Sequence, residues 1–338
     1  MSGSWQKMSR DGPTVAVDCE PPPDPAGVEG RVVLALGGDV MIGRLVNRSI
    51  ALHGYVHPWG DVLPLLGRTD LNLVNLEAAL TTCSEPVPKV FNFRADPDRV
   101  HTLQAARIDV VTLANNHVLD YGPAGLEETL VVLERAGIAH VGAGKDAHGA
   151  RSPVVLTRNG LRIGILGCTD NEPGWAATEG TPGTFYVRVG DLEPLRRVIA
   201  ALRPEVDLLV LSMHWGPNMR ERPTPAFVRF ARTLVDLGVD ILHGHSAHLV
   251  QGIEWYRGSL ILYDTGDFVD DYAVDPQLRN DRSFLFLVEV DRAGIRRLCL
   301  VPVLIGAMQV NLALGDERTE TIARMARLCA EMGTSLQR

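Results

Sequence analysis

The residues most able to do chemistry in this sequence are acids, amides and histidines gathered in five short segments. Asp39 lies in the first segment, Asn75 and Glu77 in the second, and His214 in the fourth. Carboxylates, amide oxygens and imidazoles bind divalent cations, and imidazole also transfers protons near neutral pH. Together the segments predict a metal-dependent active site. The third and fifth segments contribute Asn115, Asn116, His117, Asp120, His245 and His248.

Each of the five segments follows an apolar run that is typical of a buried strand. Open α/β sheets bind ligands beyond the carboxyl ends of their strands, so five such ends would deliver their polar residues to one edge. Gly37 and Gly38 are expected to give the first strand a sharp exit that exposes Asp39. The runs cover residues 32–36, 71–75, 109–113, 206–212 and 240–242.

Structural roles compete with these chemical roles. Asp39 could cap a following helix, Asn115 and Asn116 could form a turn, and any single histidine could be a buried core residue. Three histidines within six residues, at positions 243, 245 and 248, favour a site. His243 is closest to the preceding strand and is expected to be structural.

Acid–base pairs could act beside the metal ligands. Asp120 could orient the imidazole of His117 and hold its charge. In the same way Asp264 or Asp267 could pair with a histidine of the fifth segment, either the one at 245 or the one at 248. The next two acids, at 270–271, are expected to face solvent.

Several residues near these segments are candidates for substrate contact. Asn75 and Trp215 lie next to the predicted ligands in the sequence. A stretch that alternates cations with aromatic rings could hold an anionic group and an apolar side chain, or could be an ordinary exposed strand edge. This stretch consists of Lys89, Phe91, Phe93 and Arg94.

The composition describes an ordinary globular protein of 338 residues, with 46% hydrophobic and 22% charged residues. The formal net charge of −8 argues against a nucleic-acid partner, which would favour a basic face. No apolar run approaches the roughly 18 residues that a membrane-spanning helix needs, so no membrane segment is expected.

Residues 1–30 are rich in proline, glycine and acids, and are predicted to be a disordered leader. They lack the basic and apolar regions of a secretory signal. The five cysteines, at 19, 83, 168, 299 and 329, are odd in number and show no CxxC spacing. They are expected to be free thiols in a reducing compartment, which predicts a cytoplasmic protein.

The order of the expected elements indicates the fold class. Strands and helices alternate in the first part of the chain, whereas the last third contains hairpins. Asn159-Gly160 is a further strong hairpin turn. The pattern predicts an α/β protein in which two packed mixed sheets are flanked by helices, an αββα sandwich, as one domain over residues 31–338. A doubly wound sheet with a β-rich appendage is the alternative.

The five segments, in this order, resemble the CapA family of capsule and poly-γ-glutamate biosynthesis proteins. That family is itself similar to the calcineurin-like metallophosphoesterases. The resemblance covers roughly residues 31–275 and implies a calcineurin-like sandwich with a metal centre at the sheet edges. It implies that His245 or His248 stands in the last ligand block. The metal ligands that it implies are Asp39, Glu77, Asn116 and His214.

Two departures from the phosphoesterase pattern bear on the metal. Met41 stands where a histidine usually follows the first aspartate, and Gly244-His245-Ser-Ala-His248 replaces a Gly-His-x-His block. Losing an imidazole weakens a dinuclear site. The oxygen-rich remainder favours one hard divalent cation, Ca²⁺, Mg²⁺ or Mn²⁺, without an organic cofactor. Two-metal phosphoester hydrolysis is correspondingly disfavoured.

Some soluble members of the family resemble the peptide epimerases of lasso-peptide biosynthesis. This resemblance implies an isomerase that inverts the Cα of the C-terminal residue of a ribosomal precursor peptide. Two His–Asp pairs beside a cation suit that reaction, since one removes the proton and the other returns it. Lys89 or Arg94 would hold the peptide carboxylate. The alternatives are a metal-dependent phosphoesterase or hydrolase, and a non-catalytic accessory protein of capsule synthesis.

Overall fold

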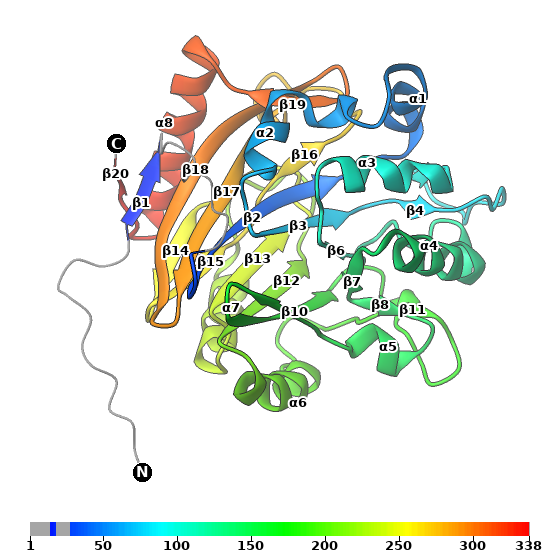
Figure 1. Cartoon of the computed structure of the whole chain (residues 1–338), viewed down its shortest axis with the longest axis horizontal. Coiled ribbons are helices and arrows are strands. Elements are labelled where there is room, and N and C mark those ends of the chain that lie inside the picture. Colours follow the sequence, from blue (N-terminus) through cyan, green and yellow to red (C-terminus); the bar gives the residue numbers. More distant parts are fainter. Residues whose placement is uncertain (1–13, 18–27, 338) are drawn as a thin grey trace.

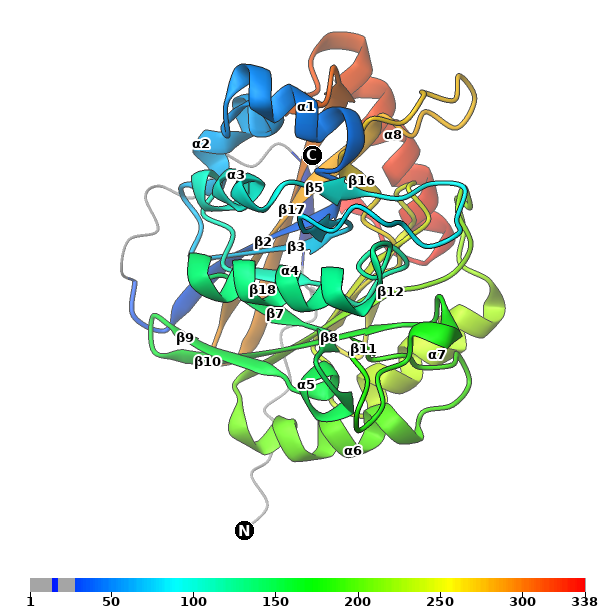
Figure 2. The same cartoon turned by 90° about the vertical axis from the view of Figure 1, so that its right-hand side faces the viewer.

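The computed structural model describes residues 14–17 and 28–337. Two β-sheets pack face to face, and helices cover their outer surfaces (Figure 1). Figure 2 shows α1, α2 and α3 on one side of the sheets and α6 on the opposite side. The helices are α1 (Arg44–His53), α2 (Leu63–Leu66), α3 (Val100–Ala105), α4 (Gly122–Ala136), α5 (Ala147–Arg151), α6 (Glu193–Leu202), α7 (Pro225–Asp236) and α8 (Gly315–Glu331). Short 3₁₀ helices span His57–Val62, Pro97–Arg99, Pro173–Trp175 and Arg203–Glu205.

The first sheet has ten strands. They are β1 (Thr14–Val17), β2 (Arg31–Val40), β3 (Leu71–Leu76), β6 (Val110–Thr112), β7 (Ala139–Val141), β16 (Asp267–Val269), β17 (Arg282–Asp291), β18 (Gly294–Gly306), β19 (Gln309–Leu312) and β20 (Leu336–Gln337). Their order is β20-β1-β18-β17-β2-β3-β6-β7, with β16 beside β2 and β19 beside β18.

The second sheet has six strands, in the order β14-β15-β13-β12-β10-β9. These are β9 (Val154–Arg158), β10 (Leu161–Thr169), β12 (Leu208–His214), β13 (Ile241–His245), β14 (Ile253–Tyr256) and β15 (Ser259–Leu262). Two small pairs complete the strands: β4 (Ala79–Leu80) with β5 (Arg94–Ala95), and β8 (Ala143–Gly144) with β11 (Gly183–Thr184). The hairpin predicted at Asn159-Gly160 is present, because β9 and β10 pair antiparallel across it.

Alternation along β2 shows how the layers form. Leu34 and Leu36 belong to the apolar cluster between the sheets, together with Ile163 of β10. Val33 and Ala35 face the other way, into the cluster that the first four helices cover. Successive side chains of a strand point to opposite faces, so an almost wholly apolar strand fills two cores at once. The αββα sandwich predicted from the sequence is therefore confirmed.

The strand register brings the site residues to one edge. Parallel pairing of β2 with β3 sets Asp39 beside Asn75, and parallel pairing of β12 with β13 sets His214 beside His245. Contrary to expectation, β2 makes no sharp exit, and Asp39 is a fully buried residue within the strand. Gly38 instead permits close packing, since a Cβ there would lie 1.8 Å from the carbonyl oxygen of Gly266.

Two expectations for the ends of the chain need correction. The leader was predicted to be disordered over residues 1–30, but residues 14–17 form β1, which pairs with β18 and β20. Residues 1–13 and 18–27 lie outside the described residues. Cys299, on β18, is disulfide-bonded, so the prediction of five free thiols is wrong at that position. Cys83, Cys168 and Cys329 are free. In the described part of the chain no helix is long and apolar enough to cross a membrane.

Candidate metal centre

Buried donors from both sheets meet around Asp39. Its carboxylate forms one group with His214 and His245, and a second group with Glu77 and His248. In each group the possible ligand atoms all lie within 4.8 Å of one another. Because Asp39 belongs to both groups, its two oxygens could serve two neighbouring cation positions or one shared position.

The geometry around Asp39 is close. His245 Nδ1 lies 3.6 Å from Asp39 Oδ1, and His248 Nδ1 lies 3.2 Å from Asp39 Oδ2. The Nδ1 atoms of His214 and His245 are only 3.0 Å apart. Burial lowers the pKa of His214 to about 3, and burial also lowers the pKa of His245 well below its ordinary value. Both imidazoles are therefore neutral at pH 7, which leaves a ring nitrogen free to bind a metal.

Several buried oxygens at this edge have no hydrogen-bond partner within the described residues. Burying such atoms unpaired is costly, and a bound cation is one way to satisfy them. The cluster therefore fits a divalent cation. The orphaned atoms are Asp39 Oδ2, Glu77 Oε1, Asn116 Oδ1 and Asp267 Oδ2.

The donor set is richer in nitrogen than the sequence predicted. His245, expected to be catalytic, lies in the first donor group, so one carboxylate and two imidazoles meet there. That composition is typical of Zn²⁺, Fe²⁺ or Mn²⁺ sites more than of purely oxygen-ligated Ca²⁺ or Mg²⁺. Met41 is buried in the helix-side core and supplies no ligand, as its replacement of a histidine implied.

Asn75 is part of the cluster, and the substrate contact predicted for it stays a prediction. Its Nδ2 donates to Asp39 Oδ1 at 2.8 Å and to Glu77 Oε2 at 3.0 Å. Its Oδ1 accepts a 2.9 Å hydrogen bond from Asn115. Burial, together with the charge of Asp39, raises the pKa of Glu77 well above its usual value. The amide thus bridges the two carboxylates by donating to both.

His117 and Asp120 form the first acid–base pair. His117 Nδ1 donates to Asp120 Oδ2 at 2.6 Å, and its Nε2 faces Glu77 Oε1 at 3.8 Å. Lys89 binds the other oxygen of Asp120 at 2.9 Å and also the main-chain oxygen of Asn116. Burial lowers the pKa of His117, and Lys89 adds to this effect, although Asp120 opposes it. His117 is thus neutral, with its Nε2 directed at the donor cluster.

His248 and Asp267 form the second pair. His248 Nδ1 donates to Asp267 Oδ1 at 2.8 Å while also facing Asp39. Burial alone would lower the pKa of His248, but the charge and hydrogen bond of Asp267 and the carboxylate of Asp39, 3.2 Å away, raise it well above the ordinary value. This histidine is therefore cationic when no metal competes for it. The catalytic roles predicted for both pairs stay predictions.

The neighbouring acids differ from expectation. Asp264 pairs with no histidine in the described part of the chain; its oxygens accept from the main-chain nitrogens of Ala247 at 2.7 Å and Gly266 at 2.8 Å, so it holds the turn. Asp270 and Asp271 are not solvent-facing. Asp270 is buried, and Asp271 accepts a 3.0 Å hydrogen bond from Leu45 N.

The predicted substrate residues mostly have structural contacts. Phe93 is fully buried and packs edge-on against His117, with ring centres 4.5 Å apart. Arg94 donates to the main-chain oxygen of Cys83 at 3.1 Å. Trp215 is buried, and its Nε1 donates to Tyr263 O at 2.8 Å. Lys89 lies beside the site but is already bound to Asp120.

Two residues at the centre were not foreseen. Ser212 Oγ lies 3.0 Å from both His243 Nδ1 and His245 Nε2, which fixes these rings. Its position two residues before His214, on the same face of β12, was a usable signal. Tyr272 packs edge-on against His248, with ring centres 5.1 Å apart. That contact joins separate elements, so no local pattern indicated it.

The structure is thus an αββα sandwich of two mixed sheets with buried acid and histidine side chains at the strand ends. Residues 33–272 match the profile of the family described as bacterial capsule synthesis protein PGA_cap, and the chain belongs to this family. Among solved structures, a hypothetical protein from Thermus thermophilus is similar in fold, with a TM-score of 0.50 and 15% identity. The match covers 80% of this chain and 98% of that one.

Curated relatives have names that refer to polymer synthesis. A probable polyglutamine synthesis accessory protein of Mycobacterium tuberculosis is 35% identical, over 89% of this chain and 93% of its own length. The capsule biosynthesis protein CapA of Bacillus anthracis is 30% identical, over 71% of this chain and 60% of its own length. The PGA biosynthesis protein CapA of Bacillus subtilis is 31% identical, over 79% of this chain and 70% of its own length.

Proposed function

We propose that this protein is an accessory protein in the synthesis of an anionic glutamate polymer, in which it acts as a metal-dependent hydrolase. One observation carries the proposal: a neutral histidine, His117, faces a buried donor cluster whose carboxylate oxygens lack partners among the described residues. The names of the relatives support the biological setting. They back an accessory role more directly than the epimerase predicted from the sequence.

The residues of the centre divide the chemical work. Asp39, His214 and His245, with Glu77 and His248, would hold the cation. A divalent ion held there would supply Lewis-acid chemistry to the bond under attack. His117 Nε2 accepts a proton from the attacking water and returns it to the leaving group. Asp120 holds the resulting imidazolium, as in other acid–base pairs.

The proposal is tested with two generic chromogenic substrates, bis-p-nitrophenyl phosphate and γ-glutamyl-p-nitroanilide. The metal-loaded protein is expected to cleave at least one of them, to lose this activity with a chelator, and to regain it with Zn²⁺ or Mn²⁺. His117→Gln is expected to keep the metal and lose turnover. Protein that contains metal but cleaves neither substrate, nor an oligo-γ-glutamate, would show that the hydrolase proposal is wrong and would leave a non-catalytic accessory role.

The epimerase remains a second candidate because of the protonation states of the two pairs. His117 has a lowered pKa and suits a base, whereas His248 has a raised pKa and suits an acid. Inversion of a peptide Cα needs one of each. Incubation of a peptide in D₂O separates the candidates: epimerisation adds one deuteron per inverted residue without cleavage, and hydrolysis yields fragments.

A further inference from the structure

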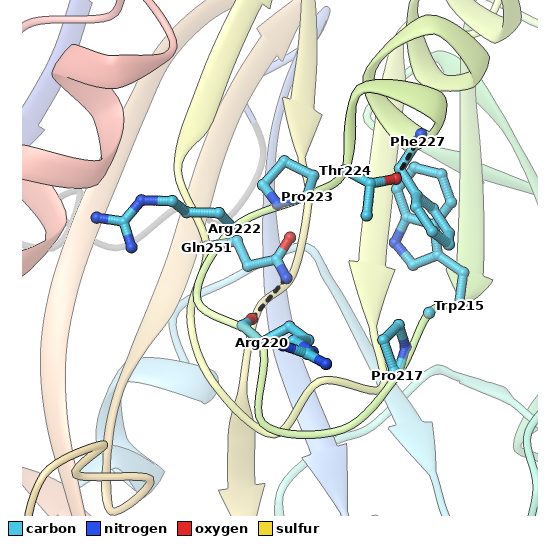
Figure 3. Close-up of a pocket in the computed structure, with 9 residues that line it drawn as sticks. Trp215, Pro217, Arg220, Arg222, Pro223, Thr224, Phe227 and Gln251 are labelled. Atoms are coloured by element: carbon cyan, nitrogen blue, oxygen red, sulfur yellow. Dashed lines mark hydrogen bonds between the residues drawn. The ribbon is translucent and has the colours of Figure 1, made fainter.

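A pocket of about 300 Å³ opens past the end of β12, the strand that ends at His214 (Figure 3). Both segments that line it begin at the proposed ligands. One continues directly from His214 into the loop before α7, and the other runs from His248 to Gln251. Six of its lining residues carry the argument: Trp215, Pro217, Arg220, Pro223, Phe227 and Gln251.

The two segments are tied together, so the pocket is a built feature of the site edge. Met219 N donates to Ala247 O at 2.8 Å, and Gln251 Nε2 donates to Arg220 O at 2.8 Å. The side chain of Gln251 is buried, which makes its bond to the loop protected from solvent. The main chain at Arg220 is therefore held in a fixed position next to the segment that contains His248.

The charge of the pocket is positive and uncompensated. Arg220 is exposed and has no ion-pair partner anywhere in the described ranges 14–17 and 28–337. Arg222, the other cation, extends away from the pocket in Figure 3 and binds Glu331 of α8 through two hydrogen bonds of 2.6 and 2.9 Å. None of the residues found to line the pocket is an acid.

The remaining walls are apolar. The ring of Phe227 packs edge-on against Trp215, with centres 4.9 Å apart, and Pro217 and Pro223 extend this surface. A ligand that fits must therefore combine methylene groups with an anionic end. A lone cation beside rings and prolines suits an aliphatic carboxylate better than a strongly hydrated phosphate, which usually takes several donors.

We propose that this pocket is a substrate subsite that binds a glutamyl unit, with its carboxylate on Arg220 and its methylenes against Phe227. The identity of this occupant rests on the proposed function. The pocket begins at Trp215, the residue after His214, so a unit bound here would lie next to a strand end that carries a proposed ligand. Arg220 then determines how the chain is positioned and takes no part in proton transfer.

The test is direct binding of tri-γ-glutamate to the metal-loaded protein, measured by calorimetry so that no turnover is needed. Arg220→Glu is expected to weaken binding roughly tenfold or more, since it reverses the charge that the carboxylate meets. Phe227→Ala is expected to weaken it roughly threefold to tenfold. Arg229→Glu is the matched control, because Arg229 is exposed on α7 and lies outside the pocket; a change below about twofold is expected from a screened surface charge.

Metal content and melting temperature verify that each variant is folded. Equal losses in Arg220→Glu and Arg229→Glu would overturn the proposal, as would full displacement of the peptide by an equal concentration of inorganic phosphate. The outcome is separable from the hydrolase test. Arg220-dependent binding without cleavage keeps the subsite and rejects the hydrolase, whereas cleavage with Arg220-independent binding does the reverse.

Discussion

Two histidine–aspartate pairs of the same chemical type lie at the metal centre, yet their surroundings give them opposite character. His117 has one close carboxylate partner, Asp120 at 2.6 Å, whose charge is shared with Lys89, and a more distant one, Glu77 at 3.8 Å. His248 faces two carboxylates, Asp267 and Asp39, and no lysine of the described chain pairs with either of them. The pKa of His117 is lowered and that of His248 is raised.

The difference shows that a His–Asp pair does not by itself define a base. Both imidazoles are almost completely buried, so burial favours the neutral form in both. The closeness of the second carboxylate, 3.2 Å from His248 but 3.8 Å from His117, and the presence of a lysine beside His117 decide the result. His117 is left neutral at the edge of the donor cluster, whereas His248 lies within it. Metal binding would displace the proton of His248, so we assign proton transfer to His117 and metal binding to His248.

The largest effect is expected from Asp39→Ala, which removes the residue common to both donor groups. Metal content should fall to background, and turnover should drop by roughly 1,000-fold or more. Because both histidine pairs lie at the centre that Asp39 organises, both should become inactive together. Metal analysis and the chromogenic assays measure this, with circular dichroism as the check on folding. Retained metal in this variant would show that the centre is not organised around Asp39.

His117→Gln should reduce turnover by roughly 100- to 1,000-fold, because general acid–base catalysis contributes about this much. Bound metal should stay at the native level, since His117 lies 3.8 Å from Glu77 and belongs to neither donor group. Added metal should not restore activity. A parallel loss of metal would place His117 among the ligands and remove the distinction between the pairs.

His248→Gln should have the opposite profile. Apparent metal affinity is expected to fall by about 10- to 100-fold, the range typical of altered metal-site residues. Turnover should be low at limiting metal and recover in excess metal, because the base is intact. A titration of activity against metal concentration distinguishes the two variants. If excess metal fails to restore the turnover of His248→Gln, His248 takes part in proton transfer, and the epimerase proposal gains support.

The sequence predicted the sandwich and the members of the cluster because both depend on local patterns. Apolar runs that end in Asp, Asn or His indicate strand ends at a site, and the register of β2 with β3 and of β12 with β13 brings them together. Roles depended on contacts between distant elements. Asp264 and Asp267 are three residues apart, yet one holds a turn and the other binds His248.

The contacts of the proposed substrate residues could not be predicted for the same reason. Phe93 and Arg94 belong to a stretch that alternates cations with aromatic rings, as an exposed strand edge can. Only Arg94–Ala95 form a strand, and Phe93 packs edge-on against His117. The exposed cation that lines the pocket without an ion-pair partner among the described residues is Arg220. It lies in a loop whose sequence has no regular pattern. Only the folded structure shows that this loop lies against the segment that contains His248.

The smallest effect is expected from Lys89→Met. This variant is also the finest test of the difference between the two histidine–aspartate pairs. Lys89 lowers the pKa of His117, so removing its charge raises that pKa. His117 acts in the neutral form, and activity is lost as pH falls through its pKa; the acid limb of the pH–rate profile should therefore move to higher pH. The shift should be less than about one unit, with a loss of less than about tenfold at pH 7. Lys145→Met, which removes an exposed lysine elsewhere, should leave the profile unchanged. An acid limb that stays in place would show that Lys89 does not set the pKa of His117. Activity that falls as pH rises through this pKa would mean that His117 acts as a cation, and the two pairs would then have the same charge.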